Sequence, residues 1–248
     1  MKNCSTQYYY EFFYTTTTTR TPSLKVETWL KLRGIPYENV YTLKFGPKGQ
    51  IPYVELNGEQ IPDSNVIIAR LTEHFKIPGE SLTPSQDALG HTIVRMVENH
   101  TCKGNFLWRY VNQGSEFLPR YFCWINPLRL AISKFMFSKG MPVSMYLHGI
   151  GRHSTAEINE FVCQDLKAIS DLLGDKDYML GDAMTTTDCS LFGHLAQFYY
   201  VKLRDFPLKD FLVNDCPNLV DYVKRIEAKF WPDWEHDCKQ ESMVNKFF

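Results

Sequence analysis

The chain has 248 residues, with 27 Lys and Arg against 28 Asp and Glu, a formal net charge of −1 and 44% hydrophobic residues. This length can bury a core as one large domain or two modest ones. The balanced charge excludes the broad basic surface that binds nucleic acids, and it excludes an acidic disordered tail. The seven cysteines form no CxxC pair, which disfavours a zinc ribbon or a dithiol redox site and favours reduced thiols in an intracellular protein.

No apolar run reaches the roughly 18 residues that a membrane-spanning helix needs. The aromatic stretch 8–14 lacks the small-residue cleavage site of a secretory signal. We therefore expect a cytoplasmic protein.

The first eighty residues predict a small α/β domain. Residues 7–14 favour a strand, and residues 22–33 a helix that opens on Pro22 and stops at Gly34. Strands are expected over 37–41 and 52–56, and Asn57-Gly58 predicts a hairpin to a strand that ends near Ile61. Asp63 is a candidate N-cap for a helix that runs to Phe75. This order is thioredoxin-like, but the loop 42–51 is too short for the second helix of that fold.

Beyond residue 83 the patterns predict helices alone. Pro78 and Gly79 mark a linker, and capping boxes begin at Thr83, Ser154 and Thr185. Pro217 opens a last amphipathic helix. We expect a thioredoxin-like domain over 1–77, a linker over 78–83 and an all-α domain over 84–248.

Several stretches resemble the glutathione S-transferase superfamily and, within it, the failed axon connections (Fax) branch, which is related to metaxins. They occur in the expected order and cover the chain from about Pro22 to Trp234: 24–30 (LKVETWL), 34–37 (GIPY), 51–59 (IPYVELNGE), Asp63-Ser64, 149–154 (GIGRHS), 180–188 (LGDAMTTTD) and 232–234 (PDW).

The resemblance implies a glutathione site at two places. Ile51-Pro52 would form a cis-proline junction, whose backbone pairs with the cysteinyl part of glutathione. Asp63-Ser64 would receive its γ-glutamyl end, with backbone N–H groups and the Ser64 hydroxyl on the carboxylate and Asp63 on the ammonium group. The alternative is that Asp63 and Ser64 form an ordinary helix cap.

The catalytic position departs from the family pattern. Fax relatives carry a Ser-Pro-Phe-Cys-like element where this chain has Arg20-Thr21-Pro22-Ser23. Either a hydroxyl of Ser23, Thr21 or Tyr14 stabilises a glutathione thiolate, with Arg20 adding positive charge, or the site is inactive. A hydroxyl cannot form a mixed disulfide, so the sequence disfavours thiol-transferase chemistry.

Two functions stay open. One is glutathione-dependent conjugation or ligand binding, with glutathione as co-substrate and an apolar electrophile between the domains. The other is a non-catalytic adaptor that uses the fold to bind proteins. The aromatic residues concentrated between 106 and 137 suit a core, an electrophile pocket or a partner face. Arg152 is either a ligand contact or part of a helix junction. The seven histidines lack metal-ligand spacing, so no metal is expected. Homodimers are common in this superfamily, and one is an alternative here.

Overall fold

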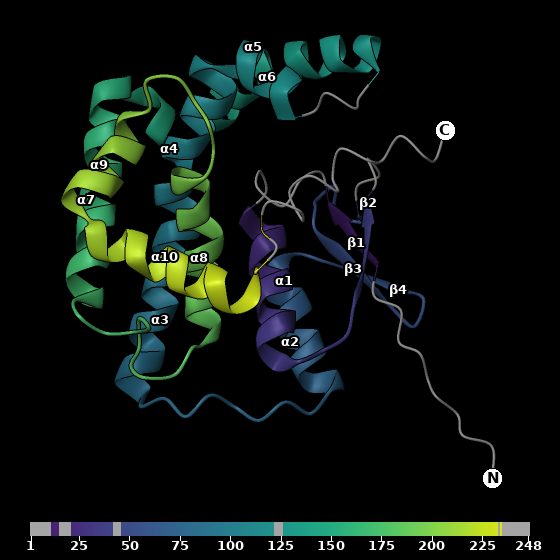
Figure 1. Cartoon of the computed structure of the whole chain (residues 1–248). Coiled ribbons are helices and arrows are strands. Elements are labelled where there is room, and N and C mark those ends of the chain that lie inside the picture. Colours follow the sequence, from purple (N-terminus) through teal and green to yellow (C-terminus); the bar gives the residue numbers. More distant parts are fainter. Residues whose placement is uncertain (1–10, 15–20, 42–45, 122–125, 233, 235–248) are drawn as a thin grey trace.

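The computed structural model describes residues 11–14, 21–41, 46–121, 126–232 and 234. The first part contains a four-stranded sheet in the order β2-β1-β3-β4, with β1 parallel to β2 and the other neighbours antiparallel (Figure 1). Its elements are β1 (Glu11–Tyr14), α1 (Thr21–Arg33), β2 (Glu38–Tyr41), β3 (Tyr53–Leu56), β4 (Glu59–Pro62) and α2 (Ser64–His74). Residues 7–10 of the expected first strand lie outside the described part.

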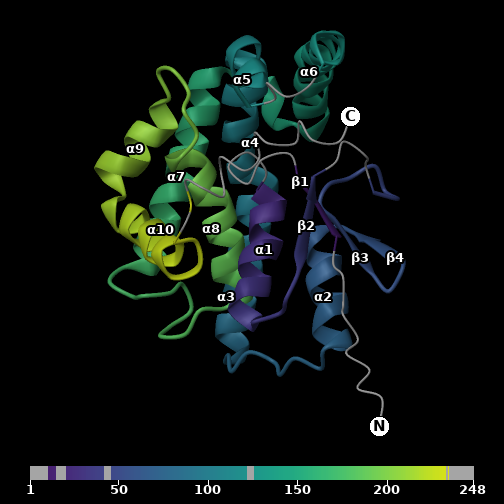
Figure 2. The same ribbon diagram turned by 45° about the vertical axis from the view of Figure 1, so that its right-hand side comes forward.

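The predicted thioredoxin-like order is confirmed. Residues 46–52, which the structure describes between β2 and β3, contain no helix. Both α1 and α2 lie on the side of the sheet that faces the helical part of the molecule (Figures 1 and 2).

The second part is helical, as predicted. The helices from α3 to η2 follow one another without a break, and two of these segments have π-helical hydrogen bonds. The elements are α3 (Pro84–Met96), η1 (Val97–Thr101), α4 (Cys102–Phe106), η2 (Leu107–Asn112), α5 (Gly114–Tyr121), α6 (Pro127–His148), η3 (Ile150–Arg152), α7 (Thr155–Leu173), α8 (Thr186–Tyr199), α9 (Pro207–Asp215) and α10 (Pro217–Phe230).

One hydrophobic core joins the two parts, because α1 packs against both the sheet and α8. Every residue from Ser23 to Leu30 is at most 3% exposed. In the sequence, Val26, Trp29 and Leu30 fall at i, i+3 and i+4, and this spacing predicts a single apolar face. A helix enclosed on both sides has no solvent face, and its polar residues must therefore find partners inside the protein.

The three predicted capping boxes help to fix the helical part. The first two are present at Thr83 and Ser154. In the third, the fully buried Asp188 carboxylate accepts hydrogen bonds from the Thr185 N–H and hydroxyl, the Met179 N–H and the Tyr222 hydroxyl, each at 2.8 Å. This carboxylate thus ties the start of α8 to α10 and to the preceding loop.

Glu80, in the segment between the two parts, makes a second tie. It pairs with Arg33 at the end of α1 and accepts hydrogen bonds from the Thr186 N–H and hydroxyl at 2.8 and 2.7 Å. The end of α10 also contacts α1, since the Trp231 indole N–H donates to Thr28. No helix in the described ranges is both long and apolar enough to cross a bilayer.

Candidate functional site

The register of the β3–β4 hairpin brings the two expected glutathione contacts together. Tyr53 pairs with Pro62 at the end of the ladder, so Pro52 and Asp63 are the residues that adjoin this last pair, one on each strand. The Ile51–Pro52 peptide bond is cis, as the resemblance implies. Strand β3 and helix α2 therefore present these residues at one place.

Asp63 has the backbone geometry of a special position. Its φ is 75°, in the region that L-residues other than Asn and Asp rarely occupy. One carboxylate oxygen, Oδ1, accepts from the Asn65 and Val66 N–H groups at 2.9 and 3.2 Å. Asp63 is thus the predicted N-cap. Its other oxygen, Oδ2, accepts no hydrogen bond from the residues that the structure describes, and it stays available to a cationic group.

Ser64 is the first residue of α2 and is 7% exposed. Within the described ranges its hydroxyl makes no hydrogen bond. It lies at the helix N-terminus, where the helix dipole and the remaining N–H group, that of Ser64 itself, favour an anion. A carboxylate placed there would satisfy the hydroxyl and the helix end together.

A buried cluster that the sequence analysis missed holds this helix end in place. The Lys25 ammonium group, 1% exposed on α1, contacts Asn65 Oδ1 and Glu98 Oε1, both at 2.6 Å. Asn65 Nδ2 donates to Glu98 Oε2 at 3.1 Å. The triangle connects α1, α2 and η1, so the N-terminus of α2 is positioned from both parts of the chain. Its signal in the sequence was a lysine between two apolar residues, Leu24 and Val26.

The histidine beside this cluster stays neutral. His194 on α8 is 6% exposed, and its Nδ1 has no hydrogen-bond partner among the described residues. Burial, with the positive charges of Lys25 and Arg109, lowers its pKa to about 3. An imidazolium there would be a third positive charge in a dry region.

The expected thiolate-stabilising residues are only partly placed. Ser23 lies in the first turn of α1 and has no exposed surface. Arg20 and the side chains of Tyr14 and Thr21 lie outside the described residues. Arg152 ends η3, where its guanidinium lies 5.1 Å from the centre of the Tyr146 ring. This contact places Arg152 at the α6–α7 junction.

The four described cysteines, which are free, are poor nucleophiles. Burial raises the pKa of Cys102 and of Cys163 to about 11, and it raises the pKa of Cys189 and Cys216 as well. Among the described residues, no group of three or more His, Cys, Asp or Glu side chains could hold a metal ion.

The aromatic residues between 106 and 137 divide between two environments. Trp108 donates to Asn159 at 2.9 Å and packs on Phe206, and Tyr110 stacks on Phe137 with ring centres 4.8 Å apart. These rings belong to the helical packing. Phe135, in contrast, is 67% exposed on α6. Phe122 and Trp124 lie outside the described residues.

Comparison with known proteins decides the family. Residues 22–114 match the profile described as "Glutathione S-transferase N-terminal domain", and residues 162–226 match "Glutathione S-transferase, C-terminal domain". The isoprene-epoxide–glutathione S-transferase of Rhodococcus sp. is 30% identical over 83% of this chain and 90% of its own length. The chain belongs to the glutathione S-transferase superfamily.

Within the superfamily, this transferase-like chain falls in the Fax/metaxin branch. It is 38% identical to failed axon connections of Drosophila melanogaster over 87% of its length, and the match spans 55% of that relative. It is 23% identical to mouse metaxin-2 over 86% of its length and 82% of that relative.

Solved structures show the same fold at low identity. The beta-etherase LigF of Sphingobium sp. strain SYK-6 has a TM-score of 0.63 at 17% identity, with 94% of this chain and 98% of that one covered. A glutathione S-transferase of Methylobacterium radiotolerans, in complex with glutathione sulfonate, has a TM-score of 0.60 at 20% identity, with 93% and 94% covered. The predicted thioredoxin-like plus all-α fold is confirmed.

Proposed function

We propose that the chain binds glutathione at the end of the β3–β4 hairpin and uses it in conjugation or ligand binding. The observation that carries the proposal is that the cis Ile51–Pro52 bond and the Asp63–Ser64 start of α2 both adjoin the last pair of the β3–β4 ladder, with Ser64 almost buried at the helix N-terminus. The relative that conjugates isoprene epoxide, by its name, and the structural neighbour with glutathione sulfonate support it.

Each group in this proposal has one task. The Ser64 hydroxyl and the Ser64 N–H bind the γ-glutamyl carboxylate, and Asp63 Oδ2 accepts from the ammonium group. The backbone of Ile51 pairs with the cysteinyl part of the tripeptide. The sulfur lies toward the N-terminus of α1, where the helix dipole stabilises a thiolate. Ser23 is the candidate hydroxyl donor, and Tyr14 and Arg20 are the further candidates from the sequence.

A second function competes with the first. The burial of Ser23, together with the 38% identity to failed axon connections, favours a non-catalytic adaptor that keeps the fold and binds proteins. A hydroxyl without exposed surface reaches a bound thiol only if the first turn of α1 opens.

Calorimetric titration of the full chain with reduced glutathione tests the binding site. We expect saturable heat at millimolar ligand or below. Ser64→Ala should weaken binding roughly ten- to hundredfold, because it removes a hydrogen bond to a charged group worth about 1.5–3 kcal/mol. Ser138→Ala, on the exposed face of α6, is the matched control and should bind as the wild type does. Absence of both heat and thermal stabilisation at about 10 mM glutathione would contradict the proposal.

Turnover separates the two functions. If Ser23 stabilises the thiolate, Ser23→Ala should lower kcat for conjugation to an epoxide by about tenfold or more while glutathione affinity stays constant. Binding without turnover in the wild type would support the adaptor.

A further inference from the structure

Helix α6 carries an apolar stripe that no described residue covers. Seven large hydrophobic side chains on this helix are between 51% and 74% exposed. Their spacings of three, four and seven residues place them on one face of a helix about 28 Å long from the first to the last. They are Leu128, Ile132, Phe135, Met136, Val143, Tyr146 and Leu147. The four other exposed large hydrophobics of the described part, Val66, Val111, Leu172 and Val213, lie on four different elements.

The opposite face of α6 is anchored in the protein. Met145 is 3% exposed, and Phe137 stacks on Tyr110 of η2. The helix lies at one end of the helical part, next to α5 (Figures 1 and 2). Apolar residues therefore occupy both the packed and the exposed sides of this helix. Packing within the described chain buries the first side and leaves the second exposed.

The segment of chain that carries the stripe has charges of a single sign. Between Glu116 and Glu157 the sequence has no acidic residue but five basic ones, at positions 120, 129, 134, 139 and 152. Lys139 is exposed on α6, and the Arg152 guanidinium covers the Tyr146 ring at the end of the stripe. The whole chain, in contrast, has a net charge of −1.

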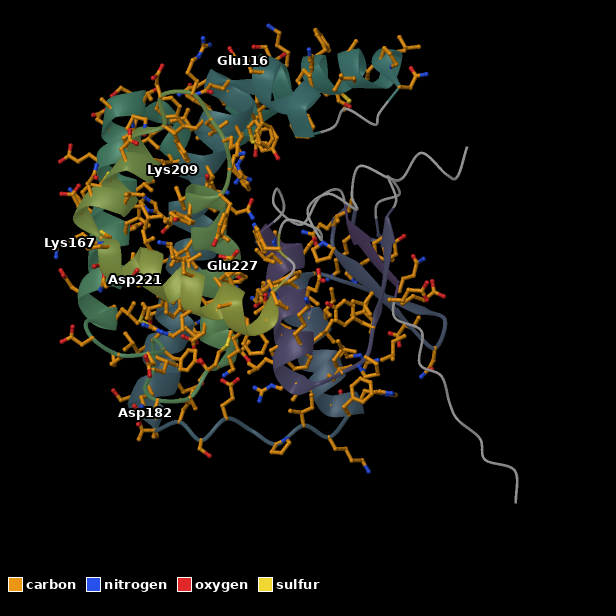
Figure 3. All side chains as sticks on the ribbon, viewed as in Figure 1. Glu116, Lys167, Asp182, Lys209, Asp221 and Glu227 are labelled. Carbon is orange, nitrogen blue, oxygen red and sulfur yellow. The ribbon has the colours of Figure 1, made fainter. Side chains whose placement is uncertain are left out.

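Elsewhere the helical surface mixes both signs. Figure 3 shows Lys167, Asp182, Lys209 and Asp221 at the side of the helical part away from the sheet. Helix α6, in contrast, carries basic residues and no acidic one.

We propose that the exposed stripe of α6 docks on the surface of an anionic lipid bilayer. A helix that exposes apolar side chains and carries basic residues lies in the plane of the membrane, with the exposed apolar side chains at the headgroup–acyl boundary and its Lys and Arg among the anionic headgroups. The 22-residue helix carries Arg129, Lys134 and Lys139 along its length, which suits a helix lying on the bilayer. The proposal is independent of the glutathione site.

A second copy of the chain is the main rival occupant. Two copies that met through α6 would bring two basic segments together, and no acidic residue between 117 and 156 could neutralise them. Anionic lipid supplies the missing negative charge, and fluid acyl chains adapt to a stripe of uneven side chains. Charge complementarity therefore favours the bilayer.

Vesicle flotation of the full chain tests this surface. Vesicles of phosphatidylcholine alone are compared with vesicles that contain about 30% phosphatidylserine. We expect binding to the anionic vesicles at least tenfold stronger, and weaker binding in 1 M salt, where the Debye length falls from about 10 Å to about 3 Å.

Paired substitutions locate the contact. Phe135→Gln with Met136→Gln should lower the partition coefficient at least about tenfold, because two exposed apolar side chains no longer enter the interface. Leu172→Gln with Val213→Gln, also at exposed apolar positions, should leave binding unchanged. Circular dichroism and unfolding confirm that both variants are folded.

Three results would overturn the proposal. They are equal binding to both kinds of vesicle or to neither, binding that the α6 pair does not weaken, and a concentration-dependent dimer in sedimentation velocity that the α6 pair abolishes. The last result would assign the stripe to self-association.

Discussion

The buried Lys25–Asn65–Glu98 cluster predicts an unequal cost for removing its two charges. Glu98→Leu leaves the Lys25 ammonium, 1% exposed, with Asn65 Oδ1 as its remaining partner in the cluster. An uncompensated buried charge costs about 3–5 kcal/mol. Lys25→Met leaves a carboxylate whose side chain is 16% exposed, 3.1 Å from Asn65 Nδ2 and 4.0 Å from Arg95, so its cost should be smaller, about 2 kcal/mol.

The double variant gives the sharper expectation. Lys25→Met with Glu98→Leu removes both charges and leaves apolar side chains of similar size. The pair should therefore be more stable than Glu98→Leu alone, because the second substitution removes the stranded ammonium.

Urea unfolding followed by tryptophan fluorescence measures these free energies, and calorimetry should show Glu98→Leu melting about 6–20 °C lower. Lys167→Met is the control, since Lys167 and its partner Asp171 are both exposed, and solvent screens the attraction between them so that the unfolding free energy should change little. If the double variant lost the sum of the two single losses, the cluster would carry no coupling and the reasoning would be wrong.

Three further predictions concern the core. Asp188→Ala should destabilise the fold by at least about 4 kcal/mol, because it leaves four buried donors without their acceptor. Tyr222→Phe removes one of these hydrogen bonds and should cost only about 1–2 kcal/mol. Equal unfolding midpoints of the two variants in urea would refute this difference. His194 has a pKa of about 3 in the fold against about 6.5 unfolded, so the unfolded chain binds more protons between these values and stability falls as the pH drops from 6.5 toward 3. Between pH 6.5 and 4.5, His194→Gln should lose about 2 kcal/mol less of its unfolding free energy than the wild type, and parallel losses would contradict the assignment. Cys102 and Cys163 should resist iodoacetamide at pH 8 in the folded protein, as mass spectrometry of the labelled peptides can show; rapid labelling would refute the raised pKa values.

Local signals explain how much of the fold the sequence could predict. The caps at Asp63, Thr83 and Ser154, and the Asn57-Gly58 hairpin, depend on residues within four positions of one another, and all are present. The hairpin register follows from that turn. It brings Pro52 and Asp63 together without any long-range information.

The missed features depend on packing between distant segments. A lysine in a helix normally marks a solvent face, and only the enclosure of α1 between the sheet and α8 makes Lys25 a buried charge. The sequence pattern likewise gives α6 no single apolar face, because Phe137 and Met145 lie on its packed side and Phe135 lies on its exposed side. The site residues themselves stay predictions.

An NMR titration of the isotopically labelled full chain with glutathione tests recognition at the N-terminus of α2. We expect saturable shifts that are largest for the backbone amides of Ile51, Ser64 and Asn65, with the same dissociation constant at each. Shifts confined to other elements, or unchanged spectra at about 10 mM glutathione, would contradict it.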